Sequence, residues 1–219
     1  MSVARNTLVQ SSLTLASRVL GMVRDILLVA RIGAGPVGDA WATAQQFPNL
    51  FRRIFAEGAF ASAFVPTYAR TLEAEGPEAA RAVAQEAMRV LFAATAALTI
   101  LAQIFMPWVL LLIHGGQADD AENYNLAVFL TRVTMPYLTF MALAALLSGV
   151  LNSSERFILS AGVPTILNLC LIPAAFVSPD PVITAKAASI AYFIAGVLQA
   201  GALWWGVRRQ KVHLSLIGF

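Results

Sequence analysis

The stretch VLFAATAALTILAQIFMPWVLLLI, residues 90–113, contains no Asp, Glu, Lys or Arg. At about 1.5 Å of rise per helical residue, it is long enough to cross a hydrocarbon core about 30 Å thick. Two more windows lack these charges, FILSAGVPTILNLCLIPAAFV at 157–177 and AASIAYFIAGVLQAGALWWGV at 187–207. Of the 219 residues, 12% are charged, about half the share of roughly 25% in soluble domains. This composition indicates a membrane protein.

Three further segments carry some charge but are mostly apolar. Continuous apolar runs favour helices over a membrane β-barrel, whose segments of about ten residues alternate between apolar and polar side chains. The sequence therefore predicts an all-α, polytopic integral membrane protein with six transmembrane helices. The predicted spans are residues 8–30, 39–68, 90–113, 126–151, 157–177 and 187–207. The charged, alanine-rich segment 70–89 is expected to form a short surface helix that leads into the third span.

The distribution of Lys and Arg predicts the orientation of these spans. Eight of these residues lie before the first span or after the second, fourth and sixth, and two lie in the alternate connections. They are Arg5, Arg70, Arg81, Arg89, Arg156, Arg208, Arg209 and Lys211, against Arg31 and Lys186. The positive-inside rule then places both termini of this chain in the cytoplasm. Because this asymmetry accounts for the net charge of +3, no nucleic-acid partner is expected.

The tryptophans offer a second indication of orientation, since indole rings collect at the two membrane interfaces. In this topology Trp41 and Trp108 are expected near the outer surface, and Trp204 and Trp205 near the inner one.

The first 25 residues resemble a signal peptide in having one early arginine and many small side chains. However, Arg18 and Arg24 interrupt the region that should be its apolar core, and no A-x-A cleavage site follows. We therefore expect a retained first helix. The single cysteine, Cys170, excludes an intramolecular disulfide and a cysteine metal cluster, and we expect it to be a small buried hydrophobe. No metal ion or cofactor is predicted.

Several charged side chains remain at or near membrane depth, where an arginine near a helix centre costs about 2.5 to 3.5 kcal/mol. The ones that matter here are Arg18, Arg24, Asp25, Arg52, Arg53 and Glu57. Two ion pairs are predicted from helical spacing: Arg53 with Glu57, four residues apart, and Arg18 with Asp25, seven apart. Asp25 is expected to be a poor partner for Arg24, because adjacent helical residues point about 100° apart. Arg24 and Arg52 are thus left without acids.

Residues that break helices lie close to these two arginines. Gly21 falls between Arg18 and Arg24, and Pro48 removes a helical hydrogen bond just before Asn49 and Arg52. Irregular backbone at membrane depth is tolerated where it is buried in protein or lines water. We therefore predict a hydrated, cationic cavity between the first two spans. Arginine, whose planar fork donates two parallel hydrogen bonds to phosphate, suits a phosphate-bearing lipid. The alternative is that these arginines only bridge helices or bind ordinary anionic membrane lipids.

Four blocks carry a family resemblance: SSLTLASRVLGMVRD at 11–25, GAGPVGDAW at 33–41, PNLFRRIFAEGAFASAFVP at 48–66 and GVLNSSERF at 149–157. With these blocks the chain resembles the MurJ (MviN) lipid II flippases of the multidrug/oligosaccharidyl-lipid/polysaccharide exporter superfamily. The similarity extends from the first residues to about Arg209. Its first three blocks are long and specific.

The resemblance implies transport of lipid II, the undecaprenyl-diphosphate-linked peptidoglycan precursor, from the inner to the outer leaflet of the bacterial inner membrane by alternating access. It also implies a fold of two six-helix lobes around a central cationic cavity, plus two further helices that form a groove for the lipid tail. The positions of Arg18, Arg24 and Arg52 line that cavity in the family, and the position of Asp39 is implicated as well. This chain is then expected to be the N-terminal lobe, residues 1–219, with the C-terminal lobe of the same protein as its missing partner.

Three other functions stay open on the sequence alone. An enzyme acting on polyprenyl diphosphates would need acids for magnesium or a nucleophile near the phosphate, whereas Asp119, Asp120, His114 and His213 all lie outside the spans. A related exporter of other polyprenyl-linked sugars or of drugs would share the fold. A scaffold without transport activity would not need its cavity arginines.

Overall fold

The computed structural model describes residues 3–56, 59–113, 121–154 and 157–210, together with Val212 and Leu214. Side chains are described from Ser11 onward in these ranges, except at residues 51, 52, 55, 56, 59 and 157. The described residues form helices and no strands. The helices are α1 (Val3–Ile32), α2 (Pro36–Ala56), α3 (Ala59–Ala74), α4 (Pro77–Ile113), α5 (Ala121–Thr134), α6 (Tyr137–Ser153), α7 (Phe157–Ala174) and α8 (Pro181–Arg209).

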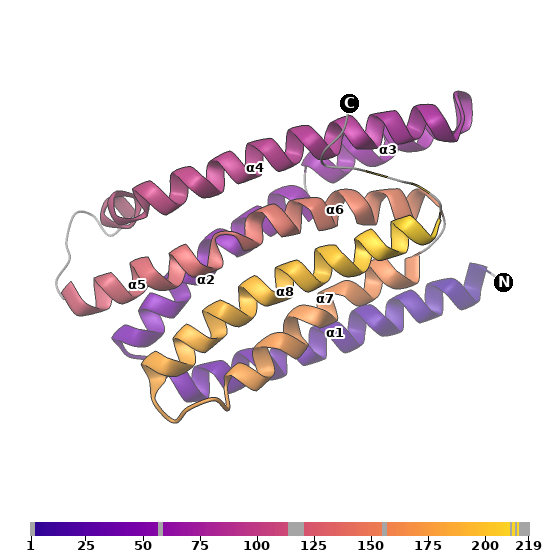
Figure 1. Cartoon of the computed structure of the whole chain (residues 1–219). Coiled ribbons are helices and arrows are strands. Elements are labelled where there is room, and N and C mark those ends of the chain that lie inside the picture. The colour runs from indigo at the N-terminus through magenta and orange to yellow at the C-terminus, as the bar shows by residue number, and fades with distance from the viewer. Residues whose placement is uncertain are drawn as a thin grey trace.

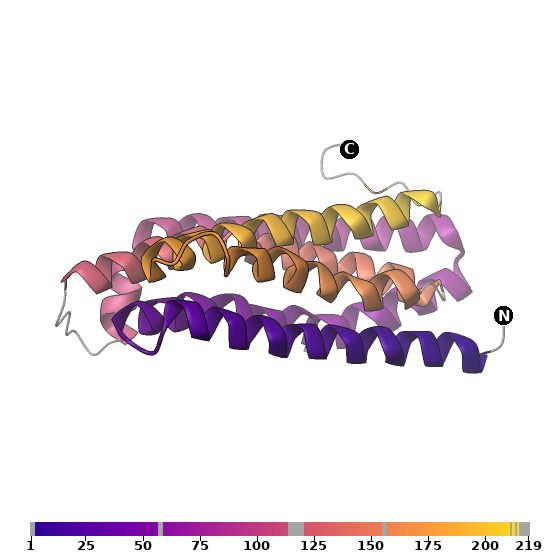
Figure 2. The same ribbon diagram turned by 90° about the horizontal axis from the view of Figure 1, so that it is seen from below.

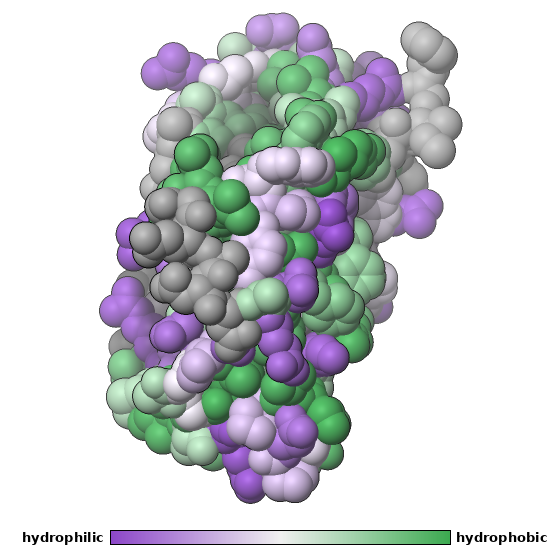
Figure 3. Space-filling model, turned by 90° about the vertical axis from the view of Figure 1, so that its left-hand side faces the viewer, coloured by the Kyte–Doolittle hydropathy of each residue, from purple (hydrophilic) through white to green (hydrophobic). Residues whose placement is uncertain are grey.

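The helices lie side by side along one long axis, as Figures 1 and 2 show. One end of the bundle, called the first end here, holds the start of α1, the α3–α4 turn, the end of α6 and the end of α8 (Figure 1). The opposite, second end holds the α1–α2 turn, the end of α4 and the α7–α8 loop (Figure 1). Seen along the axis from the second end, hydrophilic side chains lie among apolar ones (Figure 3).

Two of the predicted spans are each built from two consecutive helices. The expected span 39–68 covers parts of α2 and α3, and the expected span 126–151 covers parts of α5 and α6. The second break falls at Met135 and Pro136, where the N–H groups of Leu138 and Thr139 bond the carbonyls three residues back. Proline lacks an N–H and cannot continue the regular helical pattern, which explains this local tightening.

The prediction of six membrane spans is not confirmed by length and composition. Among the described residues, three helical stretches are long and apolar enough to cross a membrane: Pro77–Ile113, Ala121–Ser153 and Pro181–Arg209. The apolar helix Ile158–Ala174 is shorter. The last turns of α4 expose apolar side chains, which suits contact with lipid; they are Ile100, Leu101, Ile104, Phe105, Trp108 and Leu112. The chain is therefore an all-α membrane protein.

The surface helix predicted at residues 70–89 does not form as a separate element. Residues up to Ala74 belong to α3, and α4 runs without a break from Pro77 into the charge-free stretch. The first turns of α4 are not a free surface, because Ala80, Ala84 and Met88 are fully buried. They pack in one cluster with Phe64 and Tyr68 of α3. Apolar residues repeated every four positions, as at Ala80, Ala84 and Met88, indicate a buried face of a helix rather than a helix on the surface.

Helix ends follow recognisable local signals. Gly33 directly follows α1, and Gly76 lies two residues after the end of α3. Their φ angles of 84° and 89° are left-handed, a conformation that glycine adopts without a Cβ clash. Pro36, Pro77 and Pro181 each occupy the first residue of the next helix, where the missing N–H costs nothing.

Two proline-freed carbonyls are satisfied by side chains from other helices. Pro48 leaves the carbonyl of Ala44 without its helical donor, and the hydroxyl of Thr134 lies 3.0 Å from that oxygen. Pro136 does the same to the carbonyl of Arg132, which accepts a 2.7 Å bond from Nε2 of Gln103. Because lipid offers no replacement donor, these bonds let the chain keep proline inside membrane helices.

Packing around α2 places one of the tryptophans inside the bundle, whereas the predicted depth of Trp41 near the outer surface stays untested. Trp41 is 4% exposed and lies edge-on against Tyr192 of α8, with ring centroids 6.0 Å apart. It belongs to a buried cluster that includes residues of α5 and α8, so it cannot serve as a lipid-facing anchor. Trp108 and Trp205 are 64% and 54% exposed, as interfacial residues should be.

Candidate functional site

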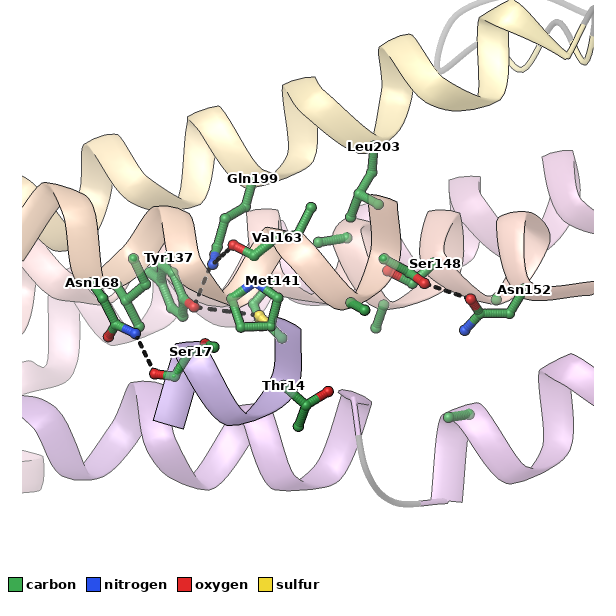
Figure 4. A pocket seen from close by; sticks show the side chains of 18 of the residues that line it. Thr14, Ser17, Tyr137, Met141, Ser148, Asn152, Val163, Asn168, Gln199 and Leu203 are labelled. Carbon is green, nitrogen blue, oxygen red and sulfur yellow. Dashed lines mark hydrogen bonds between the residues drawn. The ribbon is translucent and has the colours of Figure 1, made fainter. Parts of the chain in front are cut away.

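A cavity of about 470 Å³ lies among the helices of the bundle. Its walls come from α1, α2, α3, α6, α7 and α8, and many of its side chains carry hydrogen-bonding groups (Figure 4). The polar ones are Thr14, Ser17, Arg24, Asn49, Tyr137, Ser148, Asn152, Ser160, Asn168, Tyr192 and Gln199. Among the described residues that line the cavity, Arg24 is the one that carries a full charge.

The guanidinium of Arg24 is held from two sides. Its Nε and Nη2 donate to Oδ1 of Asp25 at 2.9 and 2.7 Å, and its Nη1 donates to Oδ1 of Asn168 at 2.9 Å. The side chain of Arg24 is 15% exposed, whereas that of Asp25 is 58% exposed. An arginine has five N–H donors, and these three bonds occupy three of them. One N–H on each terminal nitrogen therefore remains for a ligand.

The amide of Asn168 connects α7 to α1. Its oxygen accepts from Arg24. Its Nδ2 donates to the backbone carbonyl of Ser17 at 2.8 Å, as Figure 4 shows. Asn168 is 4% exposed. Since a buried amide without partners would be costly, both of its ends need these bonds.

A second group of polar side chains joins α6, α7 and α8. The hydroxyl of Tyr137 donates to Oε1 of Gln199 at 3.1 Å, and Nε2 of Gln199 donates to the carbonyl of Val163 at 3.1 Å (Figure 4). Farther along α6, Oδ1 of Asn152 accepts from the hydroxyl of Ser160 at 2.5 Å. These bonds make the wall opposite α1 polar but uncharged.

The structure brings together only part of the predicted site. Arg24 and Asn49 line the cavity. The side chains of Arg18, Asp25, Asp39 and Arg53 are exposed and are absent from the described cavity wall. Asp39 lies in the first turn of α2, near the second end, where a carboxylate complements the helix dipole. The side chain of Arg52 and the whole of Glu57 lie outside the described residues, so the predicted Arg53–Glu57 pair is untested.

The predicted partners of Asp25 were wrong. Asp25 pairs with its neighbour Arg24, and no hydrogen bond or ion pair joins it to Arg18 among the described side chains. The prediction considered only the directions in which adjacent residues leave the helix. The long arginine side chain can still bend back to the next carboxylate, and Asn168 fixes it there.

The predicted place of the cavity and its backbone also need correction. α1 is a continuous helix through Gly21, and α2 continues through Pro48. Gly21 is a packing position, because a Cβ on it would lie 3.7 Å from Oδ1 of Asn168. The cavity is thus not confined to the space between the first two spans, since α6, α7 and α8 supply most of its wall.

Sequence reasoning missed the uncharged half of this site. Asn168 and Gln199 each lie in a charge-free window, and both are buried. An amide in an apolar membrane span is itself a signal, because it needs a partner there. Asn168 and Gln199 were not predicted because the search for site residues started from charged side chains.

These features define a class: an integral membrane protein of helices only, with a polar, arginine-bearing cavity among its helices. Residues 28–218 match the family model described as Lipid II flippase MurJ. The chain belongs to this MurJ family. It is 41% identical to the probable lipid II flippase MurJ of Rhizobium tropici over 224 residues, which cover 99% of this chain and 42% of that relative. It is 38% identical to the lipid II flippase MurJ of Burkholderia cenocepacia over 200 residues, which cover 91% and 39%. The chain spans about two fifths of the length of these relatives.

Proposed function

We propose that the full-length protein containing this chain moves lipid II from the inner to the outer leaflet of the bacterial cytoplasmic membrane by alternating access. Membership of the MurJ family supports this substrate, since the relatives are named as lipid II flippases. The observation that carries the proposal for this chain is the partly buried guanidinium of Arg24 in the cavity, with N–H groups left on both terminal nitrogens.

A diphosphate leaving water needs donors that replace its hydration. Two parallel N–H groups of one arginine can take two phosphate oxygens, and this geometry is stronger than a single neutral hydrogen bond. The amide and hydroxyl groups on α6, α7 and α8 add uncharged partners for the rest of a polar head group. We propose that Arg18 and Arg52 join Arg24 in this task when the cavity changes shape, and that Asp25, Asp39, Asn49, Arg53 and Glu57 lie along the path of the head group.

The remaining part of the full-length protein is proposed to supply the opposite wall. Alternating access in transporters generally needs two bundles that rock around a site at their interface. This chain corresponds to about two fifths of its relatives, so it supplies one bundle. Produced alone, it should not move lipid II.

We propose that the chain crosses the membrane six times with the first end in the cytoplasm. The pairs α2–α3 and α5–α6 each make one pass, because each continues in the same direction along the bundle (Figure 1). Arg208 and Arg209 end α8 at the first end, while Arg31 ends α1 at the second. This separation of cations follows the positive-inside rule.

A related exporter of other polyprenyl-linked sugars or of drugs is the alternative in the same fold class. Reconstitution of the full-length protein in liposomes separates them: it should move fluorescent lipid II faster than undecaprenyl-linked sugars of other kinds and faster than a cationic drug. Complementation of a flippase-depleted bacterium by the complete gene is the matching test in cells. Transport of a drug without transport of lipid II would overturn the proposal. The family description names a transporter and not an enzyme.

A further inference from the structure

We propose that Asn168 is a positioning residue that orients Arg24 toward the diphosphate of the substrate; this inference rests on the proposed function. Asn168 lies in α7, 144 positions from Arg24 in sequence, and among the described side chains it is the one that ties this guanidinium to another helix.

The two bonds of Asn168 fix which way its amide faces. Oδ1 receives an N–H from Arg24, and Nδ2 gives one to the carbonyl of Ser17. If the amide turned over, its NH₂ group would face the guanidinium donor and its oxygen would face a carbonyl oxygen, and both contacts would be repulsive. The acceptor is therefore held on the Arg24 side.

The sequence of α1 leaves room for this arrangement. Ser17, Gly21 and Arg24 follow one another at spacings of four and three, which puts them on one face of the helix. A Cβ on Gly21 would lie 3.7 and 3.8 Å from the amide atoms of Asn168. These are ordinary contact distances, so the amide fits against the glycine, and a side chain longer than that of alanine would push it away.

A neutral partner matters for what Arg24 can bind. Asp25 also holds the guanidinium, from the side where its own carboxylate is 58% exposed. Asn168 fixes the group from the buried side without adding a negative charge. The two remaining N–H groups of Arg24 then keep their attraction for phosphate. A carboxylate at position 168 would still accept from the arginine, but it would cancel the charge of the guanidinium and lose the bond to the Ser17 carbonyl.

The test uses the purified full-length protein and measures its binding of lipid II in detergent, together with its thermal stability. Asn168→Leu, which keeps the branching of the side chain and has no polar atoms, should weaken binding about tenfold, the loss expected for a hydrogen bond to a charged group. Asn168→Asp should weaken binding at least as much: its carboxylate still pairs with Arg24 and cancels its charge, while the bond to the Ser17 carbonyl is lost, so some thermal stability should be lost too. In an Arg24→Ala protein, Asn168→Leu should cause no further loss of affinity.

The matched control is Gln103→Leu, which also removes a membrane amide that bonds a backbone carbonyl, away from the cavity wall. It should lower stability and leave affinity within about twofold. Equal affinities of wild type and Asn168→Asp would overturn the inference, as would losses that multiply in the Arg24→Ala double variant. If the wild type itself binds no lipid II, the proposed function fails, and this outcome is distinct from a failure of the positioning role.

Discussion

Arg24 and Asp25 illustrate how a cation can be held by an ion pair and still keep N–H groups for a ligand. The pair is close, with 2.7 Å between Nη2 and Oδ1, but its carboxylate faces outward. An exposed ion pair contributes at most about 1 kcal/mol. Its stabilising effect is therefore smaller than the insertion cost of the arginine, about 2.5 to 3.5 kcal/mol at a helix centre. Arg24 is a costly residue that packing alone does not explain, as expected of a functional side chain.

Replacing Arg24 tests whether its charge and its fork are both used. Arg24→Ala in the full-length protein should abolish complementation of a flippase-depleted strain while membrane insertion persists. Arg24→Lys should rescue only partly, because lysine offers a point charge in place of two parallel donors. From sequence, the same series at Arg52 should behave alike.

Arg208→Ala serves as the control, since it removes an exposed guanidinium from the last turn of α8. It should complement fully. Full activity of both Arg24→Ala and Arg52→Ala, measured by growth and by insertion level, would contradict phosphate recognition by these residues.

Asp25→Asn tests the opposing charge. The amide keeps an oxygen acceptor for Arg24 but removes the negative charge, so the guanidinium should attract phosphate more strongly. We expect lipid II binding to tighten about two- to fivefold, the range of an exposed ion pair, and the release of lipid to slow. Titration of the purified full-length protein measures the affinity. Weaker binding would indicate that Asp25 mainly orients Arg24.

At the scale of helices, carbonyl groups that lose their helical donor to a proline accept a hydrogen bond from a side chain of a neighbouring helix. Thr134 of α5 bonds the carbonyl that Pro48 frees in α2, and Gln103 of α4 bonds the carbonyl that Pro136 frees at the end of α5. Each bond therefore does two things: it satisfies a backbone oxygen that lipid cannot solvate, and it links two helices.

Removing either donor should destabilise the bundle. Thr134→Val keeps the shape of the side chain and deletes the hydroxyl, so the free energy of unfolding should fall by about 1 kcal/mol. Gln103→Leu should give a loss of similar size. Thr134→Ser keeps the hydroxyl and should lose less than Thr134→Val. Thermal unfolding in one detergent measures all three, and a Thr134→Val protein as stable as wild type would show that the freed carbonyl finds another donor.

At the scale of the molecule, the class of protein and most helical segments could be predicted because hydrocarbon allows few alternatives. A charge-free run such as residues 90–113 must be helical when it crosses a membrane. The partners of Arg24 could not be predicted, because Asn168 meets it only through the packing of α7 on α1. The burial of Trp41 likewise depends on the packing of α8. Pro136 at the break after Thr134 is visible in the sequence, but Pro48 and Pro107 lie inside unbroken helices, so a proline alone does not tell where a helix ends.

The orientation of the whole bundle can be tested by labelling from outside the cell. In a full-length protein freed of its other cysteines, including Cys170→Ala, single cysteines are placed by Glu75→Cys and Pro179→Cys. Both positions are exposed and lie at opposite ends of the bundle. An impermeant maleimide should label Pro179→Cys in intact cells and Glu75→Cys only after lysis. Labelling of both from the same side would reject the proposed topology.

The length of α4 has a consequence for the response to bilayer thickness. Its 37 residues make a helix about 55 Å long, well beyond a hydrocarbon core of about 30 Å. The charge-free residues 90–113 alone reach about 36 Å, slightly more than that core. Such hydrophobic mismatch is relieved by tilting, and a thinner bilayer demands more tilt. Because α4 has no break between Pro77 and Ile113, a tilt of its apolar part within the lipid should also move its first turns and the α3–α4 turn, which would couple membrane thickness to the first end.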